Sequence, residues 1–82
     1  MENTTKRSNA ARPFMAKFPS STCVQAFHDQ MVRKGLDNGF FNIVVNTNKN
    51  IITMDHAPAT PQVVFDSLVP LLRRNNVLEV DY

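Results

Sequence analysis

Six short segments of this chain alternate between strand-like and helix-like patterns, and their order constrains the fold more than any other feature. Residues 14–18, 40–46, 51–54 and 77–82 have the alternation or the β-branched and aromatic content of strands. Residues 22–34 and 61–74 repeat apolar side chains at helical spacing. The order strand, helix, strand, strand, helix, strand predicts an α+β domain of the βαββαβ ferredoxin-like type: a four-stranded antiparallel sheet with both helices on one face. The rival arrangement, αββαβ, lacks the first strand.

Residues that start and stop helices set the expected boundaries. Ser20, Ser21 or Thr22 can cap the first helix, and Gly35 or the turn at residues 37–39 can end it. For the second helix, Thr60 is the expected cap and Pro61 the first helical residue. Pro70 lies inside this helix and is expected to kink or divide it. Residues 47–50 are rich in turn-forming residues and are expected to join a hairpin.

The alternation also predicts which side chains face the core. The inward set is Phe14, Ala16, Phe18, Phe41, Ile43, Val45, Leu78, Val80 and Tyr82. The outward set of the second strand is Phe40, Asn42, Val44 and Asn46. A candidate interface on the outward sheet face then consists of Met15, Phe40, Val44 and Ile51. A slip of one residue in the strand assignment would exchange the two faces.

The chain of 82 residues has a net charge of +2, and its basic residues are concentrated near the N-terminus. Residues 1–12 are polar and are expected to form a flexible basic arm, and residues 13–82 one domain. A candidate nucleic-acid-binding set combines arm and helix-end bases: Lys6, Arg7, Arg12, Lys17, Arg33 and Lys34. Lys49, Arg73 and Arg74 are expected at the opposite end of the domain. The alternatives to nucleic-acid binding are that the N-terminal bases only keep the chain soluble and that the helix-end bases only stabilise their helices.

Residues able to do chemistry are few and scattered. Cys23 has two possible bases, His28 and His56, which the expected fold does not bring to it. No Cys or His spacing matches a zinc site, and no Gly-rich phosphate loop is present. RNA-recognition modules stack bases on aromatic side chains of the central strands, but residues 51–54 contain neither an aromatic nor a basic residue. The sequence therefore predicts no enzyme, metal site or cofactor.

The expected function is that of a small, non-enzymatic interaction protein acting through an apolar sheet face. It would form a homodimer or bind and modulate a partner protein. The alternative is a regulatory or accessory protein that binds DNA or RNA through its basic arm and helix-end bases. One cysteine and no long apolar stretch favour a cytoplasmic protein without membrane contact. A mitochondrial presequence in the N-terminal segment is a minor alternative.

Overall fold

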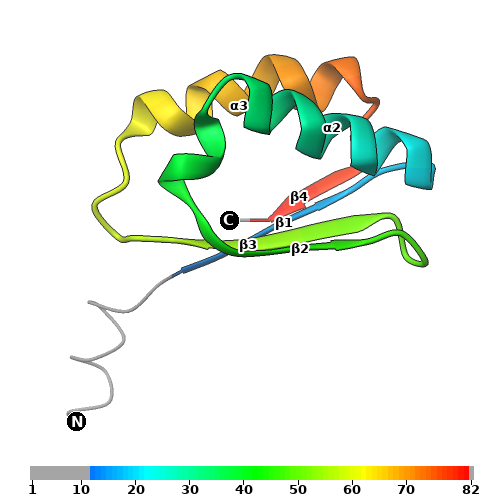
Figure 1. The fold of residues 1–82 in the computed structure, drawn as a ribbon, viewed down its shortest axis with the longest axis horizontal. Coiled ribbons are helices and arrows are strands. Elements are labelled where there is room, and N and C mark those ends of the chain that lie inside the picture. Colours follow the sequence, from blue (N-terminus) through cyan, green and yellow to red (C-terminus); the bar gives the residue numbers. More distant parts are fainter. Residues whose placement is uncertain (1–11, 82) are drawn as a thin grey trace, which may run out of the picture.

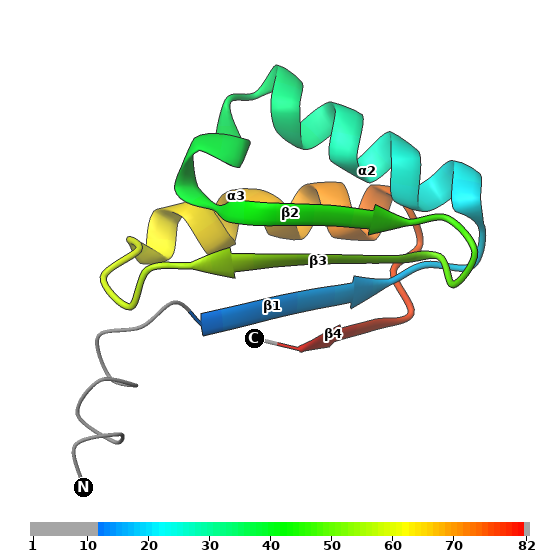
Figure 2. The same ribbon diagram turned by 60° about the horizontal axis from the view of Figure 1, so that its bottom comes forward.

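The structure, a computed structural model, describes residues 12–81. Its elements are β1 (Arg12–Lys17), α2 (Ser21–Arg33), the 3-10 turn η1 (Leu36–Gly39), β2 (Phe41–Asn46), β3 (Ile51–His56), α3 (Gln62–Arg74) and β4 (Glu79–Asp81). The four strands form one antiparallel sheet in the order β2-β3-β1-β4 (Figure 2). This is the predicted βαββαβ ferredoxin-like fold. The rival without a first strand is wrong, because β1 lies inside the sheet and pairs with both β3 and β4.

Both helices cover the same face of the sheet, and the core lies between these two layers (Figure 1). The central strand β1 presents Phe14 and Ala16 to the helices, and Phe18 follows them into the core, as its alternation predicts. The other fully buried side chains come from both helices and from β3: Val24, Phe27, Met31, Ile52, Met54, Leu68 and Leu71. The opposite face of the sheet has no covering layer among residues 12–81.

The ends of the first helix follow local chemistry closely. Ser20 is the N-cap of α2, and its Oγ accepts a hydrogen bond of 3.2 Å from the backbone N–H of Cys23. Gly35 ends the helical segment with a φ of 73°, a left-handed conformation that glycine adopts without a Cβ clash. The predicted start and stop of this helix are therefore confirmed.

The start of the second helix differs from its prediction by one residue. Pro61, not Thr60, is the N-cap, and helical residues begin at Gln62. The reason is the ψ of 144° at Pro61, which is extended and not helical. The Pro61 carbonyl still accepts a hydrogen bond of 3.0 Å from the N–H of Val64, so proline closes the first turn from outside the helix.

Pro70 does not divide α3, which runs continuously from Gln62 to Arg74. Proline removes the backbone bond that the Asp66 carbonyl would otherwise accept. Pro70 and Asp66 are both exposed, so water can satisfy that carbonyl. The expected division of the helix is wrong, because the missing hydrogen bond lies on the solvent-exposed side of the helix.

A β-bulge in β2 changes which phenylalanine faces the core. The β2–β3 register shifts between Phe41 and Val44, and Asn42 within this stretch has a φ of 55°. The extra residue inverts the alternation before it. Phe40 is therefore buried at 7% exposure, whereas Phe41 is 45% exposed. The inward prediction for Phe41 and the outward prediction for Phe40 are both wrong. Val44 beyond the bulge is exposed as predicted.

The last strand is shorter than predicted, with only Glu79–Asp81 in the sheet. Val80 packs against the core as expected, and Tyr82 lies outside the described residues. Leu78 is 63% exposed, so its inward prediction is wrong. The reason is its position at the start of an edge strand, where the sheet continues on one side only.

Candidate interaction surface on the open sheet face

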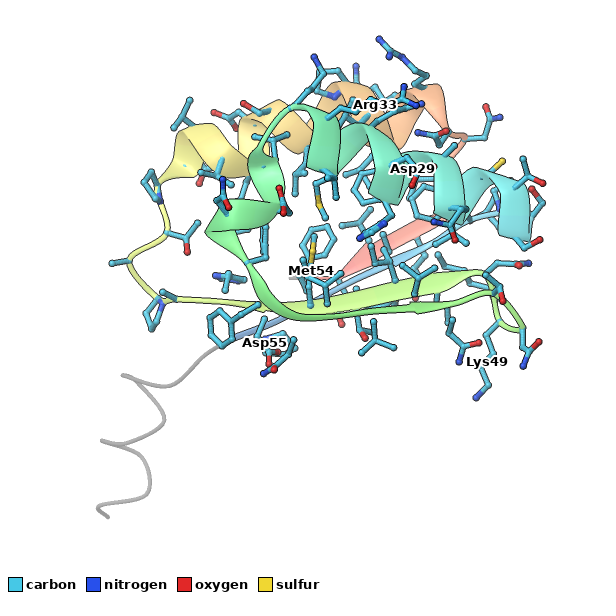
Figure 3. The ribbon with its side chains drawn as sticks, in the orientation of Figure 1. Asp29, Arg33, Lys49, Met54 and Asp55 are labelled. Carbon is cyan, nitrogen blue, oxygen red and sulfur yellow. The ribbon has the colours of Figure 1, made fainter. Side chains whose placement is uncertain are left out.

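Strand register arranges the outward side chains of the open sheet face in three rows. The middle row crosses all four strands: Val44, Thr53, Met15 and Asp81. The row toward the β2–β3 hairpin is Asn46, Ile51, Lys17 and Glu79. The third row is Phe41, Asp55 and Pro13. Figure 3 shows the alternation that produces this face, with Met54 pointing toward the helices and Asp55 away from them.

The face has an apolar half and a charged half. On β2, Phe41 is 45% exposed and Val44 is 56% exposed, and no residue of this strand is charged. On β4, by contrast, Glu79 and Asp81 both belong to the outward rows. An exposed phenylalanine beside an exposed valine on one strand is a feature of surfaces that become covered by another molecule.

Three of the four predicted interface residues lie on this face. Met15 and Ile51 are half-buried there and Val44 is exposed. Phe40 does not belong to it, because the bulge turns its ring into the core; Phe41 stands on the face instead. Asn42 is the residue that could have indicated the bulge, because asparagine adopts the left-handed backbone conformation more readily than most residues.

Both edges of the sheet are poorly suited to pairing with a further strand. The β4 edge is three residues long and carries two acids. The β2 edge is longer, but its bulge interrupts regular pairing, and the Asn42 Nδ2 donates a hydrogen bond of 3.0 Å to the Asp55 Oδ2 across it. Short length, charge and bulges are common devices that protect sheet edges from pairing. Neither edge within residues 12–81 therefore offers a regular, uncharged strand for further pairing.

Those predicted nucleic-acid-binding residues that lie within residues 12–81 do not form one surface. Lys6 and Arg7 lie outside the described residues, and Arg12 opens β1, although it was expected in the arm. Lys17 lies at the other end of β1, opposite Glu79 in the register. Arg33, at the end of α2, lies on the helical layer, and Figure 3 shows it on the opposite side of the molecule from Lys49.

A side-chain contact joins the end of α3 to α2. The Asn75 Nδ2 donates a hydrogen bond of 3.0 Å to the Gln30 Oε1. This contact places the end of α3 beside the last turn of α2, where Arg33 lies. The two helices run in opposite directions, so their last residues point toward opposite ends of the sheet, as expected for Arg73 and Arg74 against Arg33 and Lys34 (Figures 1 and 2). The expectation did not include the side-chain contact that links the end of α3 to the last turn of α2. The crossing of the two helices, which sequence periodicity does not specify, determines this placement.

Cys23, His28 and His56 lie at separate places in the fold. Cys23 is half-buried on α2 and packs against the core. The His56 ring is buried at the end of β3, with its centroid 4.8 Å from that of Phe65 and 6.3 Å from that of Phe40. The Nδ1 of His28 lies 3.9 Å from the Asp29 Oδ1 and has no hydrogen bond. Within residues 12–81 no three His, Cys, Asp or Glu side chains gather as metal ligands.

An open groove of about 570 Å³ lies between the first half of α2 and the β2–β3 hairpin. Its lining consists of Ser21, Thr22, Gln25, Ala26, Asp29 and Thr47. Asp29 is the single charged residue of this lining, and the Gln25 side chain donates to it at 3.4 Å. The groove offers hydroxyl and amide groups but no converging set of catalytic side chains.

Neither helix in the described part of the chain has the length and apolar character needed to cross a bilayer. Comparisons with models of known protein families, with curated protein sequences and with solved structures give no match. The functional argument therefore depends on the surfaces of this chain.

Proposed function

We propose that this chain is a non-enzymatic interaction protein that forms a homodimer through the apolar half of its open sheet face. The observation that carries the proposal is the exposure of Phe41 and Val44 side by side on an uncharged strand. Met15 and Ile51 extend the same apolar surface toward the middle of the sheet. A homodimer in which each copy contributes the same patch needs only such a self-complementary surface.

The distribution of charge favours one arrangement of the two copies. A two-fold axis near Val44 would place the β2 and β3 halves of both sheets in contact. Asp55 is the one acid of this half, and its carboxylate accepts a hydrogen bond of 3.0 Å from the Asn42 Nδ2. Glu79 and Asp81 on β4 would then lie at the rim, where their carboxylates keep their water. Centring the contact on β4 would instead bury two acids, Glu79 and Asp81, beside a single cation, Lys17, which is unfavourable.

The apolar area is small, so the dimer is expected to be weak. Stable interfaces bury about 800 Å² on each partner, which exceeds what half of one small sheet face offers. We therefore expect a dissociation constant between about 10 μM and about 1 mM. For so small a domain, association adds stability at protein concentrations above the dissociation constant.

Sedimentation velocity over about 10 μM to about 1 mM protein tests the proposal. The wild type is expected to change from monomer to dimer, and Val44→Lys to remain a monomer. Val63→Lys is the matched control, because Val63 is 65% exposed on α3 and lies on the other side of the molecule. A monomeric wild type at the highest concentration overturns the homodimer, as does equal dimerisation of Val44→Lys. Binding of Phe41 and Val44 to a different protein is then the competing explanation.

We place this interaction in the cytoplasm. The support is the single cysteine, which cannot form an internal disulfide in a domain of this size.

A further inference from the structure

A second surface lies on the outer side of the helical layer and is independent of the proposed dimer. We propose that Arg33 and Lys34 at the end of α2, with Arg73 and Arg74 at the end of α3, bind the phosphate backbone of a nucleic acid. The four cations come from two separate segments of the chain. The fold, not the local sequence, brings these segments together.

The hydrogen bond between Gln30 and Asn75 fixes the two helix ends relative to each other. The Asn75 side chain is buried, and its Nδ2 also donates to the Leu71 carbonyl at 2.8 Å. Arg74 immediately precedes Asn75, and Arg33 follows Gln30 by one helical turn. The Gln30–Asn75 contact therefore brings the arginines of both helix ends to one part of the helical layer.

The charges of these four residues are not neutralised within the described chain. All four side chains are exposed, and none has a carboxylate within 4.0 Å among residues 12–81. The acids on the two helices are engaged elsewhere: Asp29 accepts from Gln25, and Asp66 accepts from Gln62 at 3.1 Å. A group of unpaired cations attracts polyanions, and arginine in particular matches phosphate geometry.

The sheet face is a poor alternative for the same ligand. Its outward rows carry Asp55, Glu79 and Asp81 against Lys17. A phosphate backbone would be repelled there, whereas the helical layer offers four cations. The proposed site includes no aromatic side chain that could stack on bases. We therefore expect contacts to the phosphate backbone and little sequence preference. A dimer formed through the sheet faces would leave both helical layers accessible.

Fluorescence anisotropy of the full chain with labelled single-stranded DNA and RNA of about 20 nucleotides tests this site. Four phosphate contacts on a single strand predict that log K falls with log salt with a slope of about −2.8. Affinity should then weaken about 50-fold between about 50 mM and 200 mM salt. Either DNA or RNA can satisfy this prediction, because the backbone chemistry is shared.

Two charge-matched variants distinguish this site from net charge. In the cluster variant, glutamine replaces Arg33, Lys34, Arg73 and Arg74, and binding should be lost at about 50 mM salt. In the control variant, glutamine replaces four other cations, Lys6, Arg7, Lys17 and Lys49, and most of the binding should remain. A third variant, with lysine in place of Arg33, Arg73 and Arg74, keeps the charge and should retain binding within a few-fold. That result would show that positive charge at these positions is enough for binding. Circular dichroism confirms that each variant is folded.

Several outcomes overturn the proposal. One is the absence of binding by the wild type at about 50 mM salt. Another is an equal loss of binding in the two charge-matched variants, or a larger loss in the control, which would assign binding to net charge or to the N-terminal bases. A third is equally tight binding of polyglutamate, which would indicate an acidic protein as partner. None of these outcomes bears on the sheet-face dimer, which is tested by sedimentation.

Discussion

The bulge in β2 predicts opposite effects for two consecutive phenylalanines. Phe40 is buried, and its ring centroid lies 6.0 Å from that of Phe14, 6.3 Å from that of His56 and 5.9 Å from that of Phe65. Phe41, the next residue, is 45% exposed on the open face. We therefore expect Phe40→Leu to destabilise the domain much more than Phe41→Leu.

Leucine is chosen because it is milder than alanine. Removing a buried phenylalanine down to alanine costs about 3–5 kcal/mol, which could unfold so small a domain. With leucine, residue 40 stays apolar but loses the ring contacts of Phe40, and a small cavity remains. We expect a total loss of about 1–2 kcal/mol, or a fall in Tm of about 4–16 °C. For Phe41→Leu we expect a change within about 0.5 kcal/mol.

Urea and thermal unfolding followed by circular dichroism measure both variants. The protein is kept at about 10 μM, at or below the expected dissociation constant of the dimer, so that association contributes little to the result. The reasoning is refuted if Phe41→Leu lowers the free energy of unfolding as much as Phe40→Leu does. That result would mean that the Phe41 ring contributes as much to the core as the Phe40 ring, which the bulge in β2 does not allow.

Three further substitutions test local features of the fold by the same unfolding measurements. Pro70→Ala should stabilise the domain by about 1–2 kcal/mol, because it restores an N–H that can donate to the Asp66 carbonyl; a loss of stability would contradict this. Asn75→Ala should cost about 1–3 kcal/mol, because the buried contact with Gln30 is lost; an unchanged midpoint would contradict it. Gly35→Ala should cost about 1–2 kcal/mol at a φ of 73°, and a neutral effect would show that this conformation relaxes.

The order and type of the elements were predictable because apolar periodicity is a local property of the sequence. Phe14, Ala16 and Phe18 alternate as a strand must, and the capping hydroxyl of Ser20 lies immediately before a helical pattern. Once two helices and four strands are recognised in this order, few arrangements cover a single core. The ferredoxin-like fold therefore followed from the sequence without any long-range information.

The features that sequence analysis missed depend on single backbone angles or on packing between distant segments. The bulge depends on one φ value at Asn42, and the alternation before it is equally regular in either frame. This reversed Phe40 and Phe41, one of which had been assigned to the candidate interface. The proximity of Arg74 to Arg33 depends on how α3 crosses α2. Neither feature leaves a periodic signal along the chain.

An isotope-filtered NOE experiment tests the sheet-face dimer most directly. Labelled and unlabelled chains are mixed at about 1 mM, and only contacts between different copies are recorded. We predict intermolecular contacts to the side chains of Met15, Val44 and Ile51 on the open face. Intermolecular contacts confined to Val32 and Val63, which are exposed on the helical layer, would contradict the proposal, and so would the absence of any contact between copies.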